Sequence, residues 1–118
     1  MKLTDIASEL SADVLCGSES LLGAEAVTVT SSDLMSDVLA GKGLPDILLT
    51  GLTTVQAVRT CAVAGIKAVV IVRGKPVDDR VIELARQEDI ILMLTPLSLF
   101  EASGRLYERG LRSAFNGP

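Results

Sequence analysis

The sequence predicts an α/β fold built on a mainly parallel sheet that is covered on both faces. The runs ILLT (47–50), AVVIV (68–72) and IILML (90–94) are almost purely aliphatic. Such runs are typical of strands that are covered on both faces, as in parallel sheets. Segments with helical spacing, 54–64 and 78–87, separate them. This alternation of strands and helices indicates the α/β class.

The other elements follow from the same patterns. Residues 4–10 are predicted to form a helix, because Leu3, Ile6, Ala7 and Leu10 fall on one helical face. The remaining predictions, in chain order, are a strand over 13–16, a loop over 18–24, a strand over 26–30, a short helix that starts near Leu34 and stops before Gly41, and a last helix from about 98 to 111.

Two helix starts carry capping-box spacing. Thr53 is followed three residues later by Gln56, and Ser98 by Glu101. In this motif the hydroxyl accepts the backbone N–H of the third residue, whose side chain reaches back. Thr53 and Ser98 are therefore predicted as N-caps. Gly65 is predicted to end the helix over 54–64 in a left-handed conformation.

Length and composition predict one domain over residues 1–112 and a frayed tail over 113–118. Hydrophobic residues make up 48% of the chain and aromatic residues only 3%, so the core must be aliphatic. So apolar a composition in a small domain favours burial of some surface against another subunit. We expect a homodimer; a small alanine-rich core is the alternative.

The net charge is −4, which argues against a nucleic-acid partner, because such surfaces are basic. The N-terminus lacks a signal-peptide pattern, and the longest apolar run is broken by Gly65 and Lys67. No membrane association is expected. Cys16 and Cys61 lack metal or redox spacing and are expected to be free buried thiols of a cytoplasmic protein.

Ten residues follow the predicted strands and form the candidate ligand site. Ligands of open parallel sheets gather beyond the carboxyl ends of the strands, and helix N-termini there attract anions. Two glycines allow close approach, and two basic side chains add positive charge. The alternative is that these residues only form turns and caps. The candidates are Ser31, Ser32, Asp33, Thr50, Gly51, Thr53, Arg73, Gly74, Lys75 and Thr95.

Enzyme chemistry has little support. The chain has no histidine, which excludes His-based triads and His metal ligands. Asp33 and Asp37 have the spacing of a carboxylate pair, but helix-start acids facing water have it too, and Ser32 has no visible base. The sequence predicts no catalytic residue, no metal and no cofactor.

Five strings, taken together, resemble the DRTGG domain family over about residues 1–111. They are ASEL…VLCG, SSDLMSDVLA, LLTGLTT, IKAVVIVRGK and LSLFEASGRLYERGL. The letters DRTGG do not occur, and Leu49-Thr50-Gly51 is their nearest counterpart. Such domains occur alone, beside CBS domains and inside phosphate acetyltransferases. They are similar to the N-terminal domain of HPr kinase/phosphorylase, whose kinase chemistry lies in another domain.

The resemblance implies a non-catalytic regulatory role, in which the domain senses a small anionic or nucleotide-like ligand. Because free-standing copies resemble products of redox gene neighbourhoods, it also implies an alternative, an accessory subunit of an iron hydrogenase-type complex. It further implies a three-layer α/β/α sandwich with a core strand order of 2-1-3-4. That order predicts a crevice between Ser31-Ser32-Asp33 and Arg73-Gly74, with Thr50-Gly51 beside it.

Overall fold

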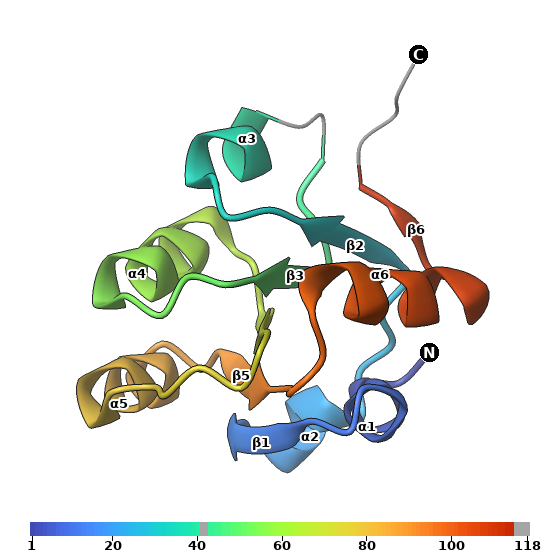
Figure 1. The fold of residues 1–118 in the computed structure, drawn as a ribbon. Coiled ribbons are helices and arrows are strands. Elements are labelled where there is room, and N and C mark those ends of the chain that lie inside the picture. The colour runs from blue at the N-terminus through green and yellow to red at the C-terminus, as the bar shows by residue number, and fades with distance from the viewer. Residues whose placement is uncertain (41–42, 115–118) are drawn as a thin grey trace.

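One six-stranded sheet, mostly parallel, forms the centre of the molecule (Figure 1). The computed structural model describes residues 1–40 and 43–114, and for Ser20 and Leu21 the backbone only. The strand order is β1-β5-β4-β3-β2-β6, and β1 alone among the described strands runs antiparallel to its neighbour. The strands are β1 (Asp13–Cys16), β2 (Thr28–Ser31), β3 (Ile47–Thr50), β4 (Ala68–Ile71), β5 (Ile91–Leu94) and β6 (Arg112–Ser113).

The helices lie on both faces of the sheet, as the α/β/α prediction requires (Figure 1). The helices α3, α4 and α5 cover one face, and α1 and α6 cover the other. The described helices are α1 (Leu3–Glu9), α2 (Glu19–Leu22), α3 (Met35–Ala40), α4 (Val55–Ala64), α5 (Asp79–Gln87) and α6 (Leu99–Glu108). The predicted loop over 18–24 therefore contains the short helix α2.

The strand order implied by the resemblance is wrong. Strands β2, β3, β4 and β5 follow one another in sequence order, so β3 lies between β2 and β4. The burial of the strands explains this order. All four residues of β3 are buried, as a central strand requires, whereas β2 carries the half-polar run TVTS and is partly exposed. The crevice expected between β2 and β4 is therefore occupied by β3.

The right-handedness of the connections between parallel strands explains which face of the sheet each helix covers. The crossovers from β2 to β5 all advance in one direction, and right-handed connections then place α3, α4 and α5 on the same face. The chain next returns through α6 to β6, beside β2. Because this last step runs in the opposite direction, α6 lies on the other face.

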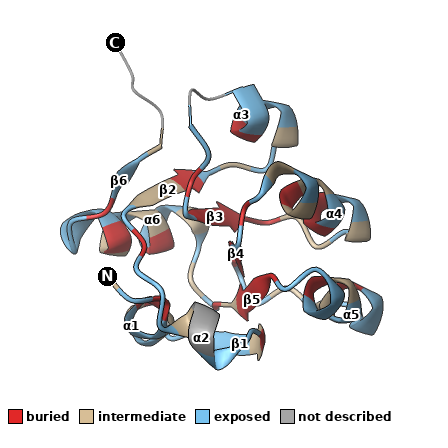
Figure 2. Cartoon of the chain, turned by 180° about the vertical axis from the view of Figure 1, so that it is seen from behind, coloured by how far each residue is buried: buried red, intermediate tan, exposed pale blue. Residues whose placement is uncertain are grey.

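Two aliphatic clusters hold the layers together (Figure 2). Alternate residues of each strand point to opposite faces. Leu49 and Val70 thus pack with Leu106 of α6, whereas Leu48 and Val69 pack against the α3–α5 face. Both clusters lack aromatic side chains among their buried members, as the composition predicts.

The start of α4 differs from the prediction by one residue. Thr54, not Thr53, is the N-cap, and its hydroxyl accepts the N–H of Ala57 at 3.1 Å. At the start of α6, Ser98 accepts the N–H of Glu101 at 3.1 Å, as predicted. Gly65 ends α4 with φ +92°, also as predicted.

The end of the chain also differs from the prediction. Ser113, assigned to the frayed tail, pairs in β6 with Val29, and the N–H of Ala114 donates to the Val29 carbonyl at 3.2 Å. Residues 115–118 of the predicted tail lie outside the described residues. Among the helices of the described parts, none has the length and apolar character needed to cross a membrane.

Candidate functional site

Two other segments, one after β2 and one after β4, meet at the junction between β3 and α4. The carboxylate of Asp33, which follows β2, accepts the N–H of Gly51 at 2.6 Å and the hydroxyl of Thr50 at 3.1 Å. Lys75, which follows β4, donates its ammonium to the Gly51 carbonyl at 2.8 Å. Both peptide groups of Gly51 are thus bound by charged side chains from neighbouring strands. We call Asp33, Thr50, Gly51, Arg73 and Lys75 the Gly51 cluster.

Gly51 is required for space and not for its φ. It is absent from the described residues with positive φ, so the turn does not demand a left-handed conformation. A Cβ placed on Gly51 would lie 3.1 Å from Arg73 Nη2, 3.2 Å from Lys75 Nζ and 3.3 Å from Asp33 Oδ1. Two cations and one carboxylate therefore approach a single backbone position within contact distance.

Arg73 is held in an unfavourable backbone conformation. Its φ is +65°, and that of Gly74 is +59°. Non-glycine residues rarely adopt this region, and such outliers cluster at functional sites. Two hydrogen bonds fix the turn: Arg73 N–H donates to the Leu97 carbonyl at 2.8 Å and Gly74 N–H to the Thr95 carbonyl at 2.9 Å.

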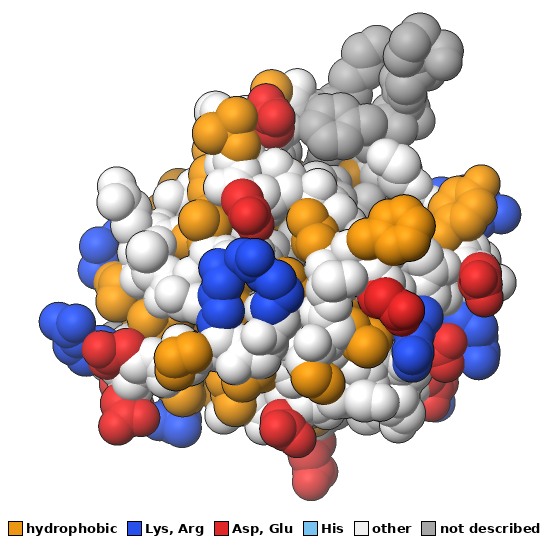
Figure 3. Space-filling model, viewed as in Figure 1, with side chains coloured by type: hydrophobic (Ala, Val, Ile, Leu, Met, Phe, Trp, Pro, Cys, Tyr) orange, Lys and Arg blue, Asp and Glu red, His pale blue; other side chains and the backbone are white. Residues whose placement is uncertain are grey.

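The guanidinium of Arg73 is exposed and makes no hydrogen bond or ion pair with any described residue. The cluster carries two positive charges and one negative charge, so its net charge is +1 in a chain of net charge −4. Figure 3 shows a compact basic group in the middle of this face with an acidic side chain directly against it. The donors of the Arg73 guanidinium are therefore available for a charge-assisted hydrogen bond with an anion.

The other predicted residues have structural roles. Thr95 is fully buried; its hydroxyl donates to the Leu10 carbonyl at 2.6 Å and accepts the N–H of Leu97. Thr53 neither caps α4 nor bonds to the cluster through a described contact. Gly74 supplies the second left-handed residue of the Arg73 turn. Of the ten candidates, the structure therefore gathers Asp33, Thr50, Gly51, Arg73 and Lys75 in one place.

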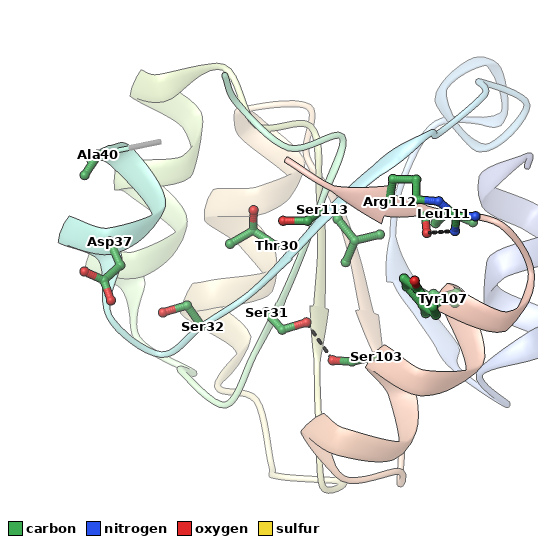
Figure 4. A pocket seen from close by; sticks show the side chains of 12 residues that line it. Thr30, Ser31, Ser32, Asp37, Ala40, Ser103, Tyr107, Leu111, Arg112 and Ser113 are labelled. Carbon is green, nitrogen blue, oxygen red and sulfur yellow. Dashed lines mark hydrogen bonds between the residues drawn. The ribbon is translucent and has the colours of Figure 1, made fainter. Parts of the chain in front are cut away.

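Ser31 and Ser32 instead line a separate cavity of about 510 Å³ at the edge of the sheet (Figure 4). The cavity lies between β2, β6, α3 and α6. Ser31 Oγ is 2.6 Å from Ser103 Oγ, and Ser32 binds the backbone of Leu34. Asp37 lines the same cavity, so it does not form a pair with Asp33.

Sequence reasoning missed Ser103, Tyr107 and Arg112, which also line this cavity. Arg112 lies over the Tyr107 ring, 5.0 Å from its centroid, and donates to the Leu111 carbonyl at 2.9 Å. The sequence places Ser103 and Tyr107 in the predicted last helix and Arg112 just after it, and gives no sign that they meet β2. The return of the chain along β2 as β6 brings them to the cavity, and a run of two strand residues carries no periodic signal.

The cysteines are not reactive centres. Both thiols are free and buried. Burial raises the pKa of the Cys61 thiol to about 11. Burial also raises the pKa of Cys16, whose thiol lies 3.1 Å from the Ile90 carbonyl and donates to it. Over the described part of the chain, no group of three or more His, Cys, Asp or Glu side chains is placed to hold a metal ion.

Comparison with known proteins supports the resemblance seen in the sequence. No family model and no curated protein matches the chain. The structure is similar to that of the CBS and DRTGG domains from the regulatory region of a Clostridium perfringens pyrophosphatase, which was solved with its activator, diadenosine tetraphosphate. The TM-score is 0.69 at 20% sequence identity.

The likeness covers 89% of this chain and 45% of the solved one. The chain therefore spans a little under half the length of the structure that it matches. At this identity the likeness establishes the fold. It agrees with the DRTGG resemblance, which rests on residues spread over most of the chain.

Proposed function

Starting from the likeness to a DRTGG-containing regulatory region, we propose that this chain is a non-catalytic regulatory domain that senses a small anionic or nucleotide-like ligand at the Gly51 cluster. The pyrophosphatase region with this fold is regulatory and binds a nucleotide activator. The sequence also has no histidine, the side chain that most often serves as a general acid or base.

One observation carries the proposal: the Arg73 guanidinium, without a described partner, and the Lys75 ammonium converge on the buried backbone of Gly51. A phosphate group accepts charge-assisted hydrogen bonds from such a pair, and arginine can bind two of its oxygens at once. The left-handed backbone of Arg73 costs stability, which is the behaviour expected of a residue retained for binding.

The carboxylate of Asp33 would compete with an incoming anion for the two cations of the site. This carboxylate already accepts the Gly51 N–H and lies beside both cations. An incoming anion must share the cations with this carboxylate or displace it. Displacement would free the segment that leads from β2 into α3, because Asp33 lies on that segment, two residues before Met35, where the helix begins. Ligand binding would in this way alter the surface formed by α3.

Thermal unfolding with ATP, diadenosine tetraphosphate, acetyl phosphate and inorganic phosphate tests the proposal. A ligand present at one hundred times its Kd stabilises the folded state by about 2.7 kcal/mol. Arg73→Ala should abolish the shift. Arg86→Ala is the matched control, because Arg86 is an exposed arginine at the other end of α5, paired with Glu83. A shift that survives Arg73→Ala, or no shift with any of the four compounds, contradicts the proposal.

A second function, protein docking, is supported by α6. Ala102 and Leu106 of this helix are buried, and Arg105 and Arg109 bind Glu9 of α1. The remaining side exposes Phe100 and Tyr107, which are 86% and 66% accessible. They are seven residues apart and so share a face, with the side-chain-free Gly104 between them.

We propose that this face of α6 is where the chain meets a second copy of itself or, in the alternative, a redox-complex partner. Phe100→Glu should disrupt either contact without loss of folding, since the side chain is exposed. Light scattering of the purified chain separates the two. A dimer that Phe100→Glu converts to a monomer supports self-association, and a dimer that persists places its interface elsewhere.

A further inference from the structure

The cavity at the edge of the sheet contains a hydroxyl for which the described residues supply no partner. Thr30 lines the cavity and is only 5% exposed. Its hydroxyl has no hydrogen-bond partner among the described residues. No polar side-chain atom of the described residues is both sealed from solvent and unsatisfied, so this hydroxyl opens into the cavity. The hydroxyl is therefore open to a bound molecule, which would replace water as its hydrogen-bond partner.

The end of β6 creates the cavity. This strand pairs with Thr28 and Val29 only, so Thr30 and Ser31 extend beyond it at the edge of the sheet. Thr30 is in register with Leu48 and points toward the α3 face, while Ser31 points toward α6. Side chains from both faces of the sheet therefore line one space, as Figure 4 shows.

At the end of the cavity lined by Thr30, Ser31 and Asp37, most of the hydrogen-bonding groups can accept, whereas Arg112 at the other end donates. Ser103 donates its single hydroxyl proton to the Leu99 carbonyl at 2.7 Å, so Ser31 must donate to Ser103 and keeps its own lone pairs free. The carboxylate of Asp37 makes no bond to a described residue and accepts only. Thr30 both donates and accepts. A complementary ligand would present several O–H or N–H donors.

The charges and the volume of the cavity restrict the class of ligand further. Asp37 and Arg112 carry opposite charges at opposite ends of the cavity (Figure 4), so the lining favours a ligand without net charge. Leu106 and Leu111 supply an apolar wall. The volume of about 510 Å³ lies in the usual range for small-molecule sites, ~300–1,000 Å³.

We propose that this cavity binds a neutral, polyhydroxylated ligand of about nucleoside size through Thr30, Ser31 and Asp37. The site differs from the Gly51 cluster and does not depend on the proposed anion sensing. A hydroxylated ring would donate to Asp37 and Ser31, and its flat face would pack on the leucine wall. Thr30 would gain the partner that it lacks.

Titration of the ¹⁵N-labelled full chain with adenosine, uridine and ribose tests the assignment by NMR. Saturable shifts are expected at the amides of Thr30, Ser31 and Ser103, with dissociation constants in the millimolar range or below. Thr30→Val keeps the side-chain shape and removes the hydroxyl, and it should weaken binding by about five- to tenfold. Ser103→Phe should fill the cavity and abolish binding.

Arg73→Ala is the control and should leave these shifts unchanged. The NMR spectrum of each variant reports whether it is folded, and Thr30→Val keeps the test valid if Ser103→Phe is not. The proposal is overturned if none of the three compounds gives a saturable shift, if the shifts centre on Gly51 and Lys75, or if Thr30→Val binds as tightly as the parent chain.

Discussion

The carboxylate of Asp33 accepts a 2.6 Å hydrogen bond from the backbone N–H of Gly51, 18 residues further along the chain. The contact joins the end of β2 to the end of β3. It also places a negative charge against the two cations that the proposed ligand would need. Asp33 therefore both orders the empty site and competes for it, and its removal separates these roles.

Asp33→Asn should raise the affinity for inorganic phosphate and ATP by about fivefold. The amide oxygen still accepts the Gly51 N–H, but the negative charge is lost, which at this separation is worth about 1 kcal/mol in a watery setting. Calorimetry at low and high salt measures the change, and the gain should shrink as salt increases. Weaker binding by Asp33→Asn would mean that the carboxylate serves the ligand and does not compete with it.

Gly51→Ala should destabilise the protein by about 1 kcal/mol and weaken anion binding. The new Cβ would lie 3.1–3.3 Å from three charged atoms. These atoms are the ends of flexible side chains, so the cations would move outward and the fold would survive. Denaturant unfolding measures the cost.

Gly104→Ala is the matched control, because a Cβ at this position within α6 meets nothing within 4 Å. It should stabilise the protein by about 1 kcal/mol through helix propensity. Equal effects of the two substitutions would refute the steric role assigned to Gly51.

Arg73→Gly should be more stable than Arg73→Ala by about 1 kcal/mol, because glycine adopts the observed φ of +65° without steric conflict and alanine does not. Both variants lose the guanidinium and should bind anions equally poorly. The difference between the unfolding free energies of the two variants in urea measures the cost of the left-handed backbone conformation at residue 73. Equal stabilities would show that the turn relaxes once the arginine is gone.

Thr54→Ala should cost about 1 kcal/mol of stability, since Thr54 caps α4 through the Ala57 N–H. Thr53→Ala, one residue earlier, should change the stability by less than about 0.5 kcal/mol. Thermal melts of the two variants decide between the observed cap and the one that sequence spacing favours.

Stability should fall as the pH rises from 9 toward 11, in part because of Cys61. Its thiol has a folded-state pKa of about 11, above the ordinary value of 9.0, so the unfolded chain loses this proton first. The contribution of Cys61 is therefore fully present below pH 9 and is lost as the pH approaches 11. Melting temperatures of the parent and Cys61→Ala across this range should converge at alkaline pH; parallel curves would contradict the assignment.

The aliphatic runs determined the fold class on their own. Strands such as ILLT and AVVIV have no polar side to expose, so they must lie between two layers of helices, and this is where the structure has them. Local signals also predicted the caps and stops that depend on neighbouring residues, such as Ser98 and Gly65. The error at the start of α4 arose because Thr53 and Thr54 offer the same hydroxyl, and Thr54 is the one that caps the helix.

Only the tertiary structure decided which strand ends are neighbours. Strand order depends on contacts between segments far apart in sequence, which no local pattern encodes. The insertion of β3 between β2 and β4 brought Asp33, Gly51 and Lys75 together, whereas the alternating direction of side chains along β2 sent Ser31 to a separate cavity. The sequence thus supplied the residue types of both candidate sites, and the order and register of the strands divided them.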